Sequence, residues 1–516
     1  MTMSNLDRRR FLRMGGALSL LGAGTPFALQ LTAAGVASAA TASDYRAIVC
    51  VFMVGGNDGH NTVLATDPDS WGRYFATRNT GTDPIALMPV GTSPTPVGQV
   101  SPVTGRVVTP DTPESWGGVL PIVPSVAQPI PAGTNATVRT FGLHPFLGPV
   151  KTLFDRQRLA VVANVGALTQ PITKADYFPN SPAAPRSLFS HNDQQSTWQS
   201  GSIEGTQIGW GGAMADTLYS LNGSNVLYTS ISATGGALFL AGHTVEQYVV
   251  NPGPLPATLI MGTQGVSIYN APIDPAVVAA AVQDTSTTST IANDYAAVVK
   301  RSIAAAATIN NAVAQGPATT VPTPPSYVNP FTGLSQFNPL ALQFQAVAEL
   351  IAAAPQLGLR RQVFFVNIGS FDTHDRQNTR QPDLLGQLAQ AFAYFDATLS
   401  NLGGADLSSS VTTFTASDFG RTFTTNGDGT DHAWGSHHFV MGGAVKGGNI
   451  YGQYPTLGVD DGSFLNPDMV GNALIPTTSI YQYGATLGAW FGVAPPDLAT
   501  IFPRLVNFST PTLDFI

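Results

Sequence analysis

The chain has 516 residues, of which 23 are basic, 31 are acidic and one, Cys50, is a cysteine. A net acidic chain without a basic run is a poor candidate for nucleic-acid binding, and a single cysteine excludes an intrachain disulfide. Hydrophobic residues make up 43% of the chain, too many for a disordered protein, and 53 glycines with 39 prolines indicate long loops rather than a helical bundle.

The N-terminal 39 residues follow the order of an export signal. Three arginines at 8–10 precede Phe11-Leu12-Arg13, a weakly apolar stretch follows, and Ala37-Ser38-Ala39 ends it. This order predicts a twin-arginine signal peptide over residues 1–39, and hence a periplasmic or secreted protein carried by the twin-arginine export machinery. The alternative is a basic tail ahead of a buried helix. Removal of residues 1–39 leaves 19 basic and 30 acidic residues, a net charge of −11, and no later stretch is long and apolar enough to predict a membrane span.

Alternating strand and helix patterns follow. Continuous apolar, β-branched runs predict buried strands over Ala47–Val54, Leu159–Val165, Val363–Ile368 and Val411–Thr415. Helical spacing of apolar residues predicts helices over Pro145–Arg158, Leu340–Ala353 and Asp383–Leu402. This alternation predicts an α/β fold with a doubly wound, mostly parallel sheet and helices on both faces.

Two long segments interrupt the alternation. Residues 67–140 are rich in Pro, Gly, Thr and Val with few helix signals, and residues 200–335 include an alanine-rich helical pattern over Tyr295–Ala314 before a proline-rich stretch. We interpret both as insertions, with part of the second as a linker or lid. The expected organisation is a single domain over residues 45–516.

Side chains that bind metal ions gather where the predicted strands end. They are Asp58, Asp372, His374 and Asp418, with Asp431, His432, His437 and His438 further along. The carboxyl ends of parallel strands lie at one edge of the sheet, where ligands bind, so these side chains could line one cleft. Carboxylates combined with imidazoles suit zinc, manganese or iron, whereas carboxylates alone suit calcium or magnesium.

Each of these residues also has an ordinary structural interpretation. Asp58 could cap a helix or satisfy a turn, and Asp372 could be a helix cap beside a surface histidine. Asp418 could form a plain salt bridge with Arg421. His437 and His438, at a strand start, could be one buried and one exposed residue. The agreement of several segments favours the metal site over these separate explanations.

Three segments resemble the DUF1501 family, a branch of the alkaline phosphatase/sulfatase-like superfamily. They are Val51–Thr62, Asn367–Gln377 and Ser417–Gly448. The resemblance covers residues 45–495, with the insertions least covered. It implies an alkaline phosphatase-like fold and a metal-dependent hydrolase of phosphoric or sulfuric esters, usually with two divalent metal ions and an anionic ester substrate.

The resemblance also implies roles for individual residues. Asp58 matches the carboxylate that holds one metal ion and faces the nucleophile, Asp372 and His374 match the pair that holds the other, and Asp418 matches the aspartate of a Ser-Asp-His-Gly-like turn. The remaining ligand would be one of three histidines, His432, His437 or His438.

Two positions depart from the superfamily pattern. Phe419 stands where a histidine is usual, so the second metal ion would be held differently, through Asp431 or His432, or be absent. His60 stands at a place that is often apolar, and we interpret it as a loop residue rather than as an extra ligand.

The nucleophile has several candidates. Ser190, before a predicted helix, is the first, with His191 as a ligand or base; counting back from Trp198 instead places His191 at the nucleophile position, and Ser190 could also be a plain helix cap. Thr62 is a weaker candidate. Arg421 or Lys446 could clamp an anionic oxygen.

The runner-up function is a non-catalytic, metal-stabilised surface or binding protein of the same fold, which Phe419 and the open choice of nucleophile favour. A metal enzyme of different chemistry, such as a carbohydrate-modifying hydrolase, is the third reading, because a fold does not set a function.

Overall fold

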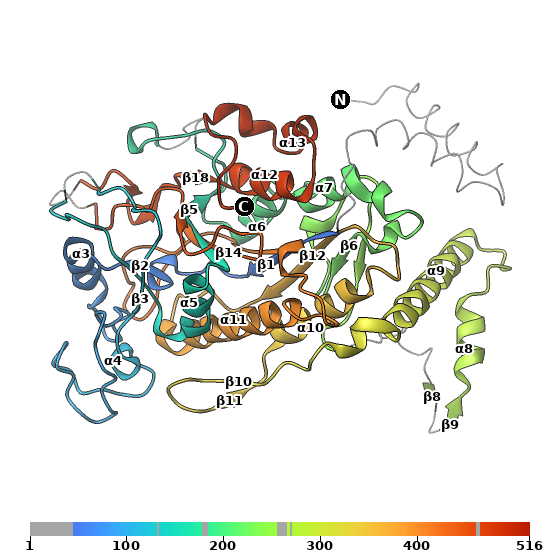
Figure 1. Ribbon diagram of the computed structural model, residues 1–516, viewed down its shortest axis with the longest axis horizontal. Helices are drawn as coiled ribbons and strands as arrows, with labels where there is room; N and C mark the ends of the chain where they lie inside the picture. Colours follow the sequence, from blue (N-terminus) through green and yellow to red (C-terminus); the bar gives the residue numbers. More distant parts are fainter. Residues whose placement is uncertain (1–44, 132–133, 178–183, 255–265, 269–270, 461–464) are drawn as a thin grey trace. The chain divides into compact units, whose positions relative to one another are not determined.

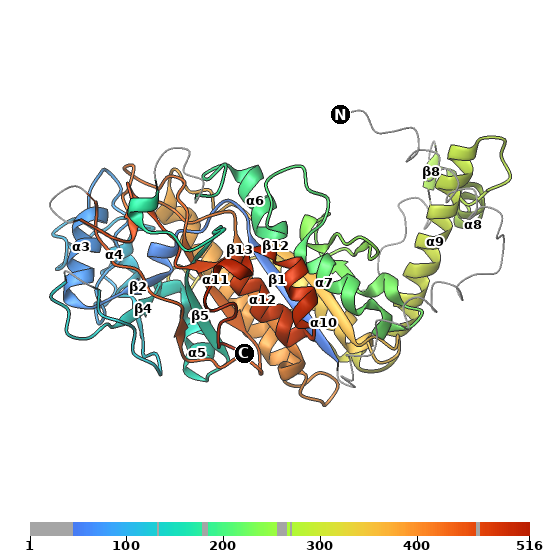
Figure 2. The ribbon, with the colours of Figure 1, turned by 90° about the horizontal axis from the view of Figure 1, so that it is seen from above.

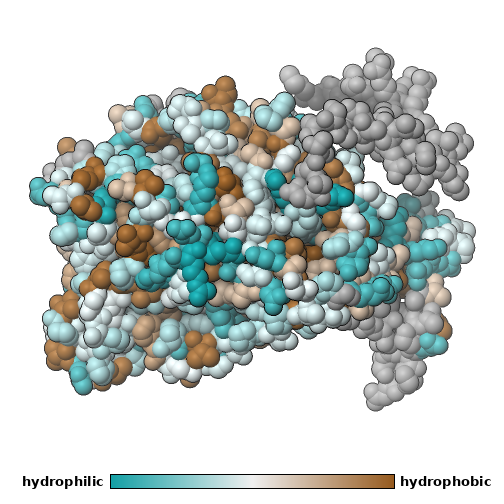
Figure 3. All heavy atoms as spheres, in the orientation of Figure 1, coloured by the Kyte–Doolittle hydropathy of each residue, from teal (hydrophilic) through white to brown (hydrophobic). Residues whose placement is uncertain are grey.

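The computed structural model describes residues 45–131, 134–177, 184–254, 266–268, 271–460 and 465–516. Residues Asp44–Ile516 cluster into one compact unit. The predicted export signal over residues 1–39 lies outside the described residues and stays a prediction. Within the described ranges, no helix is both long enough and apolar enough to cross a membrane. On the face shown in Figure 3, hydrophobic residues are scattered, and hydrophilic residues gather across the middle.

A nine-stranded sheet forms the centre of this unit (Figure 1). Its order is β15 (Ile450–Tyr451), β5 (Leu159–Gly166), β14 (Ser436–Met441), β13 (Val411–Ser417), β1 (Arg46–Met53), β12 (Arg361–Ile368), β6 (Ser230–Ser232) and β7 (Gln247–Val249), with β18 (Thr478–Ser479) beside β5. Strand β1 is parallel to both of its neighbours, β12 and β13. Only β14 runs antiparallel to its neighbours, β13 and β5. The predicted α/β fold with a mostly parallel sheet is therefore confirmed, and the sheet is mixed because of β14.

Helices cover both faces of the sheet, as the continuous apolar strands predicted. One face carries α5 (Gly148–Asp155), α10 (Pro339–Ala353) and α11 (Gln377–Leu399), and the other carries α6 (His191–Ser200), α7 (Trp210–Leu218), α12 (Ile480–Phe491) and α13 (Pro495–Ile501) (Figures 1 and 2). Along β1, Val49 and Val51 point into the hydrophobic core between the sheet and α10 and α11, while Ile48 and Cys50 point into the core between the sheet and α7 and α12. Successive side chains of a strand face opposite sides, so a strand between two cores must be apolar at every position.

Two predicted helices have different ends in the structure, and proline explains both. The helix predicted over Pro145–Arg158 is a 3-10 turn, Pro145–Leu147, followed by α5. Pro149 has no N–H to donate to the turn before it, so the regular helix begins anew at Gly148. Helix α11 begins at Gln377, six residues before the predicted start, and holds Pro382 inside. A proline usually lies in the first turn, which is why the earlier turn was missed.

Residues 67–140, which carry few helix signals in the sequence, contain two helices. Helix α3 (Pro68–Arg78) opens this segment, followed by the short α4 (Pro113–Trp116). The side chain of Asp67 accepts from the Ser70 N–H, and Pro68 occupies the first turn. Both are start signals that the sequence carried. Strands β2 (Val63–Ala65), β4 (Phe141–Leu143) and β3 (Leu120–Ile122) form a small antiparallel sheet beside it.

The segment predicted as a second insertion contains several elements. The alanine-rich pattern over Tyr295–Ala314 is α9 (Thr290–Val313), which begins after the capping side chain of Ser289 and packs against α10. Helix α7 and strands β6 and β7, which belong to the central sheet and its covering layer, also lie within this segment. It further contains β8 (Val266–Ile268), β9 (Ala271–Ile273), α8 (Pro275–Val282), β10 (Tyr327–Val328) and β11 (Ser335–Gln336).

Candidate metal centre

A cluster of imidazoles and carboxylates lies where β12 and β13 end and α6 begins. The loop after β12 supplies Asp372 and His374, and the segment before β14 supplies His432. His191 is the first residue of α6. The side chain of Asp372 is 46% exposed, so the cluster is open to solvent and to a ligand.

Three imidazoles converge on the carboxylate of Asp372. Its oxygens lie 3.2 Å from Nε2 of His374, 3.4 Å from Nε2 of His432 and 3.6 Å from Nε2 of His191. Potential ligand atoms of His191, Asp372 and His432 all lie within 4.8 Å of one another. The Nε2 atoms of His374 and His432 are 2.8 Å apart. All three histidines therefore present the same ring nitrogen to one point.

The other ring nitrogen of each histidine is held by an oxygen acceptor. Nδ1 of His191 lies 2.7 Å from Oδ2 of Asp418, and Nδ1 of His374 lies 3.1 Å from Oδ1 of Asp431. The third Nδ1 lies 2.8 Å from a backbone carbonyl oxygen. Because these acceptors carry no proton, each Nδ1 must donate, which leaves each Nε2 with a free lone pair in the neutral ring. Metal-binding histidines are held in this way.

Asp418 lies behind His191 rather than beside the other ligand atoms. Its side chain is fully buried. Oδ2 also accepts from Gln195 Nε2 at 2.8 Å, and Oδ1 accepts from the Gly55 N–H at 3.0 Å. The hydrogen bond that His191 donates to Asp418 outweighs the opposing effect of burial and raises the pKa of His191. In this structure the predicted ligand Asp418 orients a histidine.

Arg421 does not present a free guanidinium to the cluster, which corrects the expectation that it clamps a substrate oxygen. The side chain is completely buried. It donates to the carbonyl oxygens of Gly55, Gly56 (2.9 Å) and Thr430 (3.1 Å), and to the carboxylate of Asp372. Partial burial by itself would raise the pKa of Asp372, but Arg421 and the nearby imidazoles hold that pKa below its usual range. Arg421 thus keeps Asp372 charged and in place.

Phe419 packs against two of the histidines. Its ring centroid lies 4.8 Å from that of His191 and 4.5 Å from that of His432. Gly56 has φ of +86°, and a Cβ there would lie 2.5 Å from the Phe419 ring. The glycine is needed both for the left-handed backbone and for this close approach. Phe419 therefore provides an apolar ring contact for both imidazoles. Burial lowers the pKa of His432 and so favours its neutral form.

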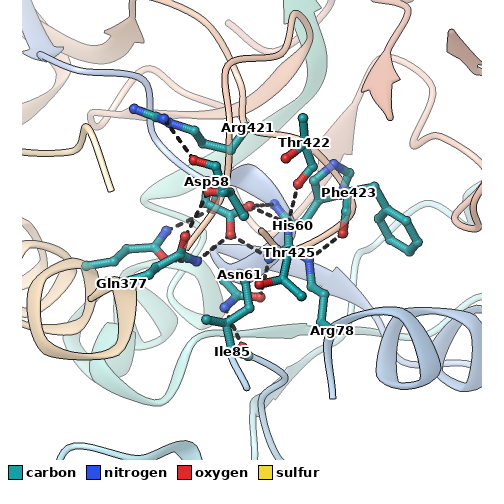
Figure 4. A network of polar contacts seen from close by, with 12 residues as sticks. Asp58, His60, Asn61, Arg78, Ile85, Gln377, Arg421, Thr422, Phe423 and Thr425 are labelled. Atoms are coloured by element: carbon teal, nitrogen blue, oxygen red, sulfur yellow. Dashed lines mark hydrogen bonds and ion pairs between the residues drawn. The ribbon is translucent and has the colours of Figure 1, made fainter. Parts of the chain in front are cut away.

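The structure does not bring Asp58 into the cluster. Its carboxylate forms an ion pair with Arg78 of α3, and both side chains are fully buried (Figure 4). It also accepts from Gln377 Nε2 at 2.7 Å and from the His60 N–H at 3.0 Å. The carboxylate to which the family resemblance assigned a metal ion is thus paired with a guanidinium. His60 is buried in the 3-10 turn Gly59–Asn61, with its ring edge against Phe423.

His437 and His438 lie in β14 and are buried away from the cluster. Nδ1 of His437 accepts from the Asn164 N–H at 3.1 Å, and its ring stacks on Tyr454. The His438 ring packs against Trp198. Of the three histidines predicted as the remaining ligand, the structure brings only His432 to Asp372.

The candidate nucleophiles differ in what occupies their hydroxyl groups. Ser190 is the N-cap residue of α6, but its side chain makes no capping hydrogen bond. Thr62 is buried and donates to the Asp58 carbonyl at 2.7 Å. Lys446, the other candidate clamp, pairs with Asp514 at the surface. Ser190 is therefore next to a cluster histidine in sequence and is not used as a cap.

Together these features define an α/β protein with a mixed nine-stranded sheet and a histidine–carboxylate cluster at its strand ends. Residues 277–500 match the model of the DUF1501 family, which is described as protein of unknown function. Among curated proteins, none matches the chain significantly in sequence.

Structural similarity to solved proteins is distant. One solved structure carries a title on the metabolism of multiple glycosaminoglycans by Bacteroides thetaiotaomicron, with a label ending in 4S-sulf. It is 9% identical in sequence, and the match covers 87% of this chain and 73% of that one with a TM-score of 0.29. Ps i-CgsB in complex with k-i-k-neocarrahexaose is 8% identical over 70% of this chain and 71% of its own, with a TM-score of 0.28. TM-scores this low carry no argument about activity.

Buried histidines outside the cluster predict a loss of stability in acid. Burial lowers the pKa of His144, His437 and His438 to about 3. Because these rings titrate near pH 6.5 once unfolded, the unfolded chain binds more protons between pH 6.5 and 3, and stability falls as pH falls. We expect each histidine to contribute a slope of up to about 1.4 kcal/mol per pH unit, measured by guanidinium unfolding. The variant His144→Gln should have a shallower slope; an unchanged slope would contradict this account.

Proposed function

We propose that the chain is an exported, metal-dependent hydrolase of phosphoric or sulfuric esters. The observation that supports this best is the convergence of three Nε2 atoms on Asp372 while each Nδ1 is held by an oxygen acceptor. Fixed tautomers with their lone pairs directed at one carboxylate are an arrangement that suits a divalent cation. The sequence resemblance to the alkaline phosphatase/sulfatase-like superfamily supplies the ester class.

The residues present fit a metal ion by their chemistry. Three imidazole nitrogens and one carboxylate form a donor set typical of zinc, manganese or iron. The His374 and His432 nitrogens are 2.8 Å apart, and two lone pairs at that distance repel unless a proton or a cation stands between them. When bound, such an ion would supply Lewis-acid stabilisation of an ester oxygen and would favour a deprotonated nucleophile.

Ser190 is our candidate nucleophile. It lies directly before His191 at the start of α6, where the first backbone N–H groups have no acceptor within the helix. These N–H groups and the helix dipole stabilise negative charge on a nearby oxygen. The Ser190 hydroxyl is not used as a cap, which leaves it available for reaction.

We propose one metal ion in place of the two that the resemblance implies. A second ion would need Asp58, but both oxygens of that carboxylate already receive hydrogen bonds from Arg78. A buried guanidinium carries a permanent positive charge, so it balances Asp58 without a metal ion.

Elemental analysis of the chain without residues 1–39, folded with zinc, manganese or iron supplied, tests the proposal. We expect about one equivalent of metal, and less than about a tenth in the variant His374→Asn/His432→Asn. His243→Asn is the matched control, because that histidine is exposed and lies outside the cluster. Absence of metal from the wild-type protein would contradict the proposal, and two equivalents of bound metal would contradict a single metal site.

A second candidate function is the non-catalytic, metal-stabilised binding protein. The buried state of Arg421 favours it, since no free guanidinium from this residue meets a substrate oxygen. A screen of phosphate and sulfate esters separates the two candidates. Turnover that depends on the bound metal and is lost in Ser190→Ala supports the hydrolase; tight metal binding without any turnover supports the binding protein.

A further inference from the structure

A pocket lies beside α6, and none of the cluster residues lines it. It has a volume of about 310 Å³, and its lining includes Arg186, Arg504, Thr197 and Tyr481. Both arginines are exposed, and neither forms an ion pair within the part of the chain that the structure describes. Two unpaired guanidinium groups in one pocket stand out in a chain with 23 basic and 31 acidic residues.

Helix α6 connects this pocket to the metal centre. His191 is its first residue, and Thr197 lies six residues further, about 9 Å along the axis at 1.5 Å per residue. The side chain of Gln194 donates to the Ser187 carbonyl at 3.2 Å, which fastens the segment that carries Arg186 to the same helix. The backbone that carries Arg186 is therefore tied to the helix that supplies His191.

The neighbouring pocket has the opposite charge. It has a volume of about 410 Å³ and is lined in part by Asp216 and Asp497. Tyr481 lines both pockets, and its hydroxyl donates to the Gly201 carbonyl at 2.8 Å, so its ring forms a wall between them. An anionic ligand would be attracted to the arginine side of this wall and repelled from the other.

We propose that the Arg186–Arg504 pocket binds a second anionic group of the substrate, so that the enzyme acts on polyanionic chains rather than on isolated esters. Its role as a subsite rests on the proposed hydrolase function. Guanidinium groups bind sulfate, phosphate and carboxylate oxygens through paired N–H donors, and these three groups share the chemistry that the pocket recognises.

Calorimetric titration at low salt tests this directly, without turnover. The probes are three oligosaccharides of equal length, one with several sulfate groups, one with phosphates and one with carboxylates, and they distinguish the source of the charge. We expect Arg186→Gln/Arg504→Gln to weaken binding of the preferred probe about 100-fold, roughly tenfold for each lost charged contact. The control is Lys300→Gln/Arg301→Gln on α9, which removes the same charge from exposed residues outside the pocket.

The same titration with Asp372→Asn separates this inference from the proposed function. Polyanion binding that survives in Asp372→Asn but is lost in the double arginine variant supports the pocket, even if no ester is hydrolysed. Equal weakening in both double variants would overturn it, because only net charge would then matter. Wild-type protein that binds none of the three probes would overturn it as well.

Discussion

Replacement of Asp372 by asparagine is expected to lower kcat/KM for a phosphate or sulfate ester by at least about 10³-fold, or roughly 4 kcal/mol of transition-state stabilisation. The variant keeps the shape of the side chain but removes the charge on which three imidazoles and Arg421 converge. It should lose most bound metal as well, because a neutral amide is a weaker ligand than a carboxylate. The checks are steady-state kinetics with 4-nitrophenyl phosphate and sulfate, and metal analysis of the same sample.

Asp375→Asn is the matched control for this variant. Asp375 lies three residues away in the same loop, is exposed and pairs with Arg380 at 3.1 Å. We expect its activity and metal content to equal those of the wild type. If Asp372→Asn keeps both its metal and its activity, the convergence of histidines on this carboxylate is structural rather than catalytic.

Much of the sheet could be predicted because strands buried on both faces have a strong signature. The run Ala47–Val54 is apolar at every position, and it forms β1 between two cores. Helix ends were less predictable, since Pro382 lies inside α11 rather than near its start. Helix α3 was missed because its residues are mostly polar, although Asp67 and Pro68 signal its beginning.

The candidate site was predictable where it depends on strand ends. Asp372 and His374 follow β12, and the topology brings them to His432. Gln195 was missed, although it lies four residues after His191 and hence on the same side of α6. Asp431 was weighed only as a substitute ligand, whereas it holds the imidazole of His374.

Contacts between segments far apart in the sequence explain why three predicted metal ligands lie outside the cluster. His437 and His438 sit at the correct end of the sheet, but β14 is buried on both faces, so both rings are enclosed. Asp58 follows β1 as predicted, yet its partner comes from α3, inside the segment interpreted as an insertion. No local sequence pattern around Asp58 indicates that Arg78, twenty residues later in α3, is its ion-pair partner.

That ion pair predicts the largest loss of stability among single substitutions. Arg78→Leu should lower the free energy of unfolding by about 3–5 kcal/mol, because it leaves the Asp58 carboxylate buried without its countercharge. Arg78 also donates to the carbonyl oxygens of Phe423 at 2.8 Å and Thr422 at 2.7 Å, and these acceptors would be left unpaired. Guanidinium unfolding at pH 7 measures the change.

Arg73→Leu provides the comparison on the same helix. Arg73 pairs with Asp69 at 3.1 Å, but both side chains are partly exposed, at 24% and 18%. Water screens such a pair, so its loss should cost less than about 1 kcal/mol. A similar cost for both variants would mean that α3 is held by its apolar contacts alone. A much larger cost for Arg78→Leu would show that the buried guanidinium anchors α3 to the loop that follows β1.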